Sequence, residues 1–364
     1  MVHRARSRCD SSISVALGLL GVAACLISGI ALQGAAGAAP AKNTFHLASW
    51  LGGAYSDPRS KSFEYCAAAK SSPEKTGIAY SVDRSYRWGV TLSDPQWSFP
   101  KGATQNASLK IDDAPPMAAT VVALEPNKLS IRPRDGLLFF ARLRVAQQMQ
   151  VALGGLVLKF SLIEGGEALS ALTQCVLHST HFSQRTKSSK ALLTIDGVAK
   201  TAHNKEAVAL ASDIIGQMRV AKSELLTKPE DRPGFPADVM WKAGLVVGRL
   251  LILDTPIPMP RVSDAVIERS LEGCRGGFFF NKASEEISGS AIERVFASCQ
   301  TPDTTMSSYH LVVPRPKSGY YILSAVSSGS AFIRVAHKAA NEYEARLHSI
   351  IMPIVQRQAR SVSR

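Results

Sequence analysis

The stretch GIAYSVDRSYRWGVTL, residues 77–92, decides the fold. Apolar side chains alternate with small or polar ones in both of its halves: Ile78, Tyr80 and Val82, then Tyr86, Trp88, Val90 and Leu92. A period of two residues is typical of a β-strand with one buried face. The short link Asp83-Arg84-Ser85 leaves room for only a tight turn, so the stretch predicts an antiparallel hairpin.

Residues 44–177, which surround this hairpin, are predicted to form an antiparallel β-sandwich-like domain with short helices. Further strands are expected at 46–51, 62–68, 107–112, 118–124, 128–132, 148–153 and 155–162. The pair Gly154-Gly155 indicates a two-residue hairpin between the last two. Short helices are expected from Leu137 to Val145 and from Gly165 to Leu177.

Residues 204–358 predict a second, α+β domain with an antiparallel sheet and two flanking helices, so the fold class is α+β. Asn204 is a candidate N-cap for the first of these helices, and the last runs from Tyr343 to Ile354. Strands are expected at 238–242, 245–253, 261–271, 276–281, 307–313, 320–327 and 330–336. Residues 178–203 are rich in Ser, Thr and Lys and predict a linker, and residues 359–364 predict a frayed tail.

Residues 1–38 have the layout of a secretory signal peptide. Three arginines precede an apolar run at 13–32, and Ala36-Gly37-Ala38 provides small residues for cleavage near Ala38. The remainder is then periplasmic or secreted. Two alternatives stay open: the run is long enough to remain as an inner-membrane anchor, and the residues before Cys25 resemble a lipoprotein signal that would place a lipid on that cysteine.

Four cysteines remain outside the leader: Cys66, Cys175, Cys274 and Cys299. An even number in an exported chain predicts disulfides, and four cysteines allow three pairings. We predict Cys66–Cys175 and Cys274–Cys299, because each pair lies within one proposed domain. The alternative is four buried free thiols. The sequence contains no C-x-x-C, so it indicates neither a zinc ribbon nor a thioredoxin-type site.

The stretch LLFFARLRVAQQMQVALGGLVLKFSLIEGGEALSALTQCV, residues 137–176, together with Ser49-Trp50, resembles the invasion-associated locus B family of exported proteobacterial proteins. The resemblance implies an exported β-sandwich that finishes with a helix, a hairpin and a last short helix. It covers about a third of the first domain and none of the second, and it brings no catalytic residues with it. Cys66 and Cys175 depart from the usual cysteine positions of that family.

Motifs of common enzymes are absent: the sequence has no H-E-x-x-H, G-x-S-x-G, Walker A or G-x-G-x-x-G string. The close pair His178 and His181 is interpreted as part of a solvated linker rather than a metal site. Asp112-Asp113 is interpreted as turn chemistry, and Gly276-Gly277 as a bulge rather than a phosphate loop. We therefore assign no catalytic, cofactor-binding or metal-binding residue from the sequence.

The chain is basic, with a net charge of +13, and loss of residues 1–38, which hold three arginines and one aspartate, leaves +11. Basic proteins associate with nucleic acid, anionic membranes or acidic polymers. Export and the lack of a recognition motif argue against nucleic acid. We predict a non-enzymatic exported envelope protein that acts as a periplasmic binding or assembly module. The sequence does not identify its partner: anionic envelope lipid or glycan and another envelope protein are the candidates, and we favour the interpretation that the basic residues are spread over a solvated surface.

Two other functions stay open. The chain is large enough for an exported hydrolase whose catalytic residues are separated in sequence. A membrane-tethered module that binds anionic envelope lipid or glycan is the second alternative.

Overall fold

The computed structural model describes residues 44–71, 76–180, 200–218, 223–226, 237–287, 290–316, 318–329, 343, 345–351 and 353. The predicted signal peptide with Cys25 and the anchor run 13–32, residues 181–199 of the predicted linker and the tail at 359–364 lie outside the described residues. Within the described part of the chain, no helix combines the length and the hydropathy needed to cross a bilayer.

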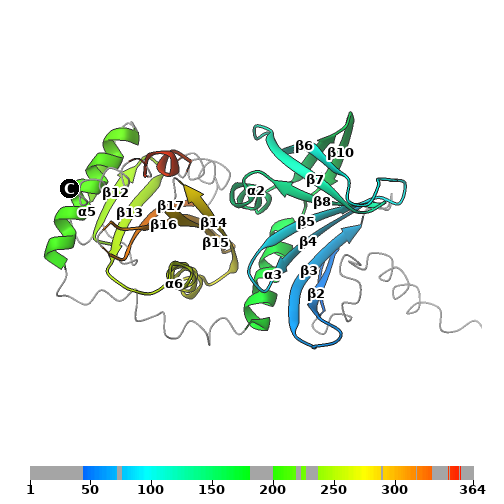
Figure 1. Cartoon of the computed structure of the whole chain (residues 1–364), viewed down its shortest axis with the longest axis horizontal. Helices are drawn as coiled ribbons and strands as arrows, with labels where there is room; N and C mark the ends of the chain where they lie inside the picture. Colours follow the sequence, from blue (N-terminus) through cyan, green and yellow to red (C-terminus); the bar gives the residue numbers. More distant parts are fainter. Residues whose placement is uncertain are drawn as a thin grey trace, which may run out of the picture. The chain divides into compact units, whose positions relative to one another are not determined.

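The first sheet contains ten strands in the order β1-β2-β3-β4-β5-β8-β7-β6-β9-β10, and all of its pairings are antiparallel (Figure 1). Their bounds are β1 (Phe45–Leu47), β2 (Trp50–Ser56), β3 (Phe63–Ser71), β4 (Gly77–Asp83), β5 (Trp88–Ser93), β6 (Thr104–Ile111), β7 (Met117–Glu125), β8 (Lys128–Pro133), β9 (Gln148–Leu153) and β10 (Leu156–Ser161). The hairpin of residues 77–92 is confirmed, with Val82 opposite Trp88. The strands belong to one hydrogen-bonded sheet, so the sandwich-like arrangement is not confirmed.

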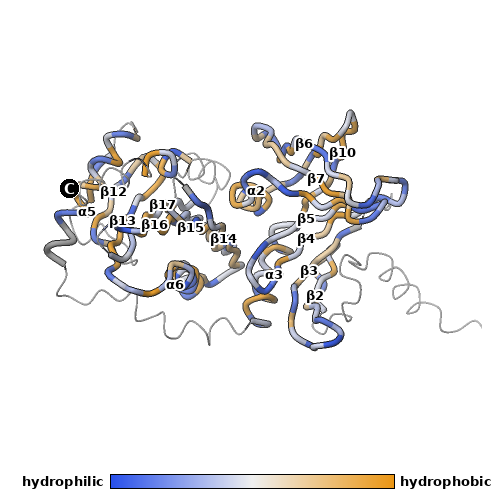
Figure 2. Tube along the Cα trace, in the orientation of Figure 1, coloured by the Kyte–Doolittle hydropathy of each residue, from blue (hydrophilic) through white to orange (hydrophobic). Residues whose placement is uncertain are grey.

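Two helices pack with this sheet, α2 (Gly136–Leu143) and α3 (Gly165–Ser179). Asp135 caps α2 because its carboxylate accepts a hydrogen bond of 3.0 Å from the Leu138 amide. Figure 2 shows α2 as strongly hydrophobic, and most of its side chains are buried. Helix α3 contacts strands β2, β3 and β4, and the disulfide Cys66–Cys175 joins it to β3 across a Cα–Cα distance of 6.2 Å.

The second sheet contains seven strands in the order β11-β12-β13-β17-β16-β15-β14, again with antiparallel pairings. Their bounds are β11 (Ser223–Leu226), β12 (Val239–Ala243), β13 (Val246–Leu253), β14 (Gly277–Ile287), β15 (Ser290–Gln300), β16 (Thr305–Pro314) and β17 (Tyr320–Gly329). The sequence reasoning missed β11 and β15, and the expected strand at 330–336 lies outside the described residues. Helix α5 (Lys200–Met218) begins four residues before the predicted N-cap, and residues 345–351 are helical as predicted.

The prediction of a strand at 261–271 is wrong, because this segment is helix α6 (Met259–Glu272). Pro258 is the N-cap and a second proline follows in the first turn, where a missing amide hydrogen costs nothing. Val262 and Val266 are buried one turn apart, and Gly273 ends the helix. Helix α6 contacts β15 and β16.

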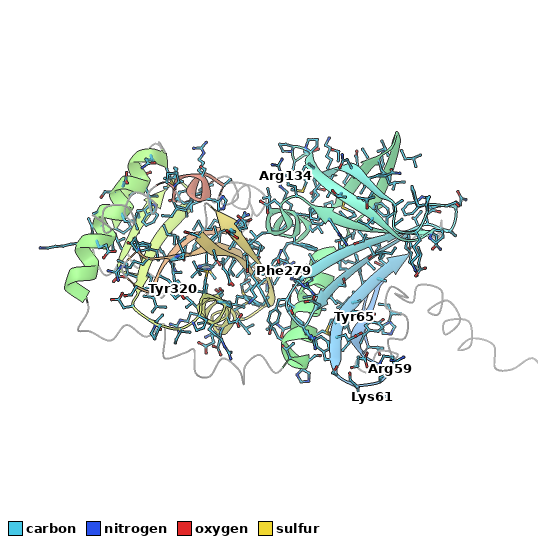
Figure 3. All side chains as sticks on the ribbon, viewed as in Figure 1. Arg59, Lys61, Tyr65, Arg134, Phe279 and Tyr320 are labelled. Carbon is cyan, nitrogen blue, oxygen red and sulfur yellow. A yellow bond between two sulfur atoms is a disulfide. The ribbon has the colours of Figure 1, made fainter. Side chains whose placement is uncertain are left out.

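The two sheets share one hydrophobic core and belong to one compact unit. Trp88 of β5 is central to this contact. Its Nε1 donates a hydrogen bond of 3.0 Å to the Phe280 carbonyl oxygen, and its ring packs against Phe140 of α2 and Phe279 of β14, which Figure 3 labels. The division into two domains at residues 178–203 therefore stays a prediction.

Candidate functional site

The structure contains both predicted disulfides, Cys66–Cys175 and Cys274–Cys299. The second joins the turn after α6 to strand β15 across a Cα–Cα distance of 5.5 Å. Disulfides form and persist in oxidising compartments, so this pairing fits a protein outside the reducing cytosol.

The other residues singled out in the sequence have structural roles. Asp112 and Asp113 lie in a turn that the Ala114 amide closes with a hydrogen bond of 3.0 Å to the Ile111 carbonyl oxygen, as predicted. The Asp112 carboxylate also accepts hydrogen bonds of 3.0 Å from the distant backbone amides of Gln147 and Gln148. Gly276 lies so close to strand β15 that a Cβ there would collide with the Gln300 carbonyl oxygen. His178 is exposed on α3, and His181 lies outside the described residues. The described part of the chain contains no group of three or more metal-ligand side chains.

An open pocket of about 740 Å³, which we call the Tyr86 groove, lies where the β4–β5 turn meets α6 and β14. Tyr86 has a φ of 62°, a left-handed conformation that is uncommon for a bulky residue. Its hydroxyl is 3.1 Å from the Thr180 hydroxyl at the end of α3. The Asp83 carboxylate fixes the turn, because it accepts hydrogen bonds from the Ser85 and Arg87 amides.

The Tyr86 groove carries an excess of positive charge. Arg84, Arg261 and Lys282 line it together with one carboxylate, Asp264. Lys282 forms an ion pair of 2.8 Å with Asp264 and lies 5.5 Å from the centre of the Tyr86 ring. Both arginines are exposed. A concave surface with three cations and one carboxylate suits a ligand that carries an anionic group.

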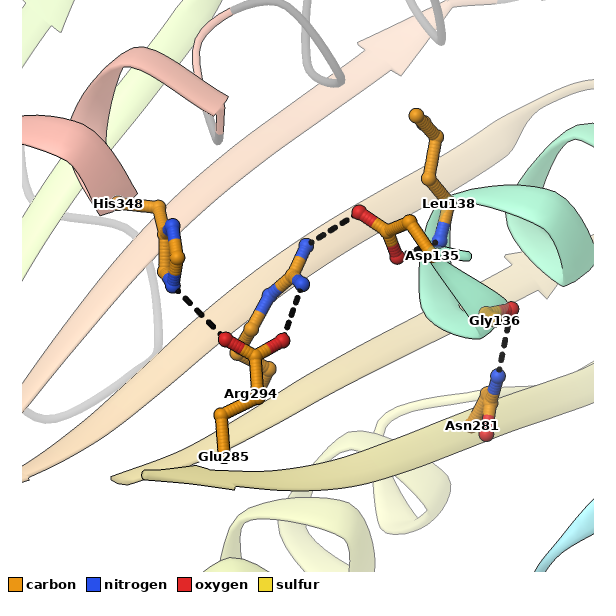
Figure 4. A network of polar contacts seen from close by, with 7 residues as sticks. All are labelled: Asp135, Gly136, Leu138, Asn281, Glu285, Arg294 and His348. Carbon is orange, nitrogen blue, oxygen red and sulfur yellow. Dashed lines mark hydrogen bonds and ion pairs between the residues drawn. The ribbon is translucent and has the colours of Figure 1, made fainter. Parts of the chain in front are cut away.

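A second polar cluster joins α2 to the second sheet (Figure 4). Arg294 of β15 donates to Glu285 of β14 at 2.6 Å and to Asp135, the N-cap of α2, at 3.2 Å. His348 in the C-terminal helical segment lies 3.1 Å from the other Glu285 oxygen. Hydrogen bonds from His348 and Arg294 lower the pKa of Glu285 to about 2. This network holds elements in place and lines no described pocket.

His310 of β16 makes a serine–histidine contact that bears on the hydrolase alternative. Its Nδ1 is 2.7 Å from the Ser324 hydroxyl and its Nε2 is 3.0 Å from the Ser308 hydroxyl. The side chain is 2% exposed, and burial lowers the pKa of His310 to about 3. Both serines and the imidazole are buried, where an external substrate does not reach them, so we assign this cluster a structural role.

The sequence reasoning did not identify the groove, and one error explains much of the failure. The sequence predicts a strand for Arg261 and Asp264, whereas both lie on the first turns of α6. Tyr86 was counted as one more alternating strand residue. The helical spacing of Val262 and Val266 after two prolines was the signal that could have found the helix.

No protein-family model matches the chain, and no curated protein sequence matches it. Two solved structures have slight likenesses. One is the crystal structure of LpqN, involved in cell envelope biogenesis of Mycobacterium tuberculosis, which is 15% identical in sequence. The match covers 34% of this chain and 75% of the LpqN chain, with a TM-score of 0.24. The di-domain ARO/CYC StfQ from the steffimycin biosynthetic pathway is 11% identical over 85% of each chain, with a TM-score of 0.16. Likenesses this slight carry no argument about this chain.

Proposed function

We propose that this chain is an exported, non-enzymatic envelope protein that binds an anionic group, from a glycan or a lipid headgroup, in the Tyr86 groove. The observation that carries the proposal is the groove itself, with three cations and one carboxylate in one concave surface. The two disulfides and the signal-like leader support export. The same proposal includes the resemblance to the invasion-associated locus B family and a sandwich-like form for the first sheet.

Binding of the purified chain to two probes tests this function. One is a vesicle of anionic and neutral phospholipid, and the other is a uronic-acid oligosaccharide. The double variant Arg84→Ala/Arg261→Ala removes two of the groove's charges without touching the core. Each basic residue near an anionic surface contributes about 1 kcal/mol, so we expect binding to weaken about thirtyfold.

A matched control removes the same charge elsewhere. Lys101 and Arg132 are exposed and do not line the groove, so Lys101→Ala/Arg132→Ala should leave binding nearly unchanged. Equal weakening by both double variants would mean that net charge alone drives binding, and the groove would lose its role. The probe whose binding the groove variant weakens identifies the source of the anionic group. If neither probe binds, the proposal is refuted.

A further inference from the structure

Arg144 is a buried cation whose partners are incomplete. It is the C-cap of α2 and is 4% exposed, and its Nε has no hydrogen-bond partner among the described residues. Two other arginines with buried side chains differ from Arg144. Arg294 and Arg315 have side chains 7% and 8% exposed, and each forms ion pairs with two carboxylates. Arg144 forms no ion pair with a described carboxylate, although the charge of Glu167 acts on it from a distance.

The guanidinium lies beside two glycines, and its position depends on the absence of a side chain at Gly166. A Cβ at Gly166 would lie 2.5 Å from Nη1 of Arg144, and a Cβ at Gly277 would lie 3.5 Å from Nη2. Any larger residue at the first position would displace the arginine. The fold therefore makes room for a charge that is costly to bury without a partner.

The Arg144 side chain lines a separate pocket of about 320 Å³, which we call the Arg144 pocket. Thr305 of β16 lines the same pocket, and its buried hydroxyl also has no hydrogen-bond partner within the described chain. The two unsatisfied donors, one on the residue that caps α2 and one on a strand of the second sheet, thus belong to residues that line one open pocket. Buried polar groups are normally satisfied by protein groups or by ordered water, so these two donors have the capacity to bond a molecule in the pocket.

Two carboxylates at the start of α3 also border the pocket. Glu164 accepts a hydrogen bond of 2.9 Å from the Ser49 hydroxyl, whereas Glu167 is exposed on the first turn. The pocket therefore offers a buried positive charge and an exposed negative one. A ligand that carries only negative charge would be repelled by the carboxylates.

We propose that the Arg144 pocket binds a small zwitterion of the α-amino acid class. The ligand carboxylate accepts hydrogen bonds from Arg144 and Thr305, and its ammonium group lies toward Glu167. A volume of about 320 Å³ is at the lower end of the range for small-molecule sites, which suits a ligand of this size. This site is distinct from the Tyr86 groove and does not depend on the function proposed for it.

Calorimetric titration of the full chain with L-alanine, acetate and ethylammonium tests the proposal. We expect L-alanine to bind most tightly, acetate more weakly and ethylammonium least. Thr305→Val keeps the side-chain shape and removes the donor, and it should weaken L-alanine and acetate alike by about tenfold. Glu167→Gln, at an exposed position, should weaken L-alanine alone by about fivefold.

Several results would overturn the proposal. One is the absence of saturable binding by L-alanine, and another is equal affinity for L-alanine and acetate in both the wild type and Glu167→Gln. Arg144→Met removes the cation itself, and circular dichroism shows whether it folds. A folded Arg144→Met that keeps the wild-type affinity for L-alanine would also exclude the site, while the Thr305 and Glu167 variants decide the question if it does not fold.

Discussion

Replacing Glu285 by glutamine tests the network that joins α2 to the second sheet. The substitution keeps the side-chain shape and removes the charge that holds Arg294 and His348. A pKa of about 2 against the ordinary 4.5 corresponds to about 3 kcal/mol of stability at neutral pH. The carboxylate is 31% exposed, so solvent screening reduces this upper value, and we expect Glu285→Gln to cost about 2 kcal/mol.

The pH dependence of this loss identifies its source. A carboxyl group whose pKa is lowered by folding stabilises the protein above its unfolded pKa, and the stabilisation disappears as the pH falls toward the folded value. The difference in unfolding free energy between wild type and Glu285→Gln should be largest near pH 6 and should fall by more than half at pH 3. Urea denaturation at the two pH values measures it. The exposed neighbour offers a control, since Glu286→Gln should change stability little at either pH. A cost that stays constant between pH 6 and pH 3 would refute the reasoning.

Three further predictions concern stability. Removing the Cys66–Cys175 disulfide, which closes a loop of 109 residues, should cost about 4.7 kcal/mol of stability, and removing Cys274–Cys299, which closes 25 residues, about 3.5 kcal/mol. Calorimetry of the two double-alanine variants measures this order, and the reverse order would contradict the loop-entropy argument. Arg315→Met leaves two carboxylates without their cation and should cost about 3 kcal/mol in urea denaturation, whereas a neutral effect would show that desolvation already cancels the ion pairs. Gly216 is exposed on helix α5 with open space around it, so Gly216→Ala should raise stability by about 1 kcal/mol. Gly276→Ala should lower stability, because its Cβ would collide with the Gln300 carbonyl oxygen. Melting temperatures that change in the same direction for both variants would contradict this contrast.

Local signals made much of the fold predictable. The hairpin at Gly154-Gly155 forms because both glycines take positive φ values, 54° and 86°, as a tight turn between twisted strands requires. The short link at 83–85 likewise predicted a tight turn, because three residues between two alternating runs leave room for nothing longer. Helix α6 was missed because its valines and isoleucine also suit a strand, and only their spacing distinguishes the two.

Neither candidate site was predictable, because each is assembled from segments far apart in the chain. The Tyr86 groove combines a turn of the first sheet with Arg261 on a helix and Lys282 on a strand of the second. Alternation and spacing specify which face of a strand is buried, but they contain no information about which strand of another sheet lies opposite. That information depends on packing, such as the contact of Trp88 with Phe279.

Arg144 and Arg294 show why residue type alone does not reveal a role. Both are buried arginines that contact the region between the sheets, and α2 has one near each of its ends. Arg294 is surrounded by carboxylates, so its burial can add to stability once the cost of desolvation is met. Burial of Arg144 has the same cost of desolvation, but no described carboxylate forms an ion pair with it. A cost that the fold does not offset is expected where a ligand supplies the missing interaction, and this difference in partners, rather than burial itself, separates the binding pocket from the structural network.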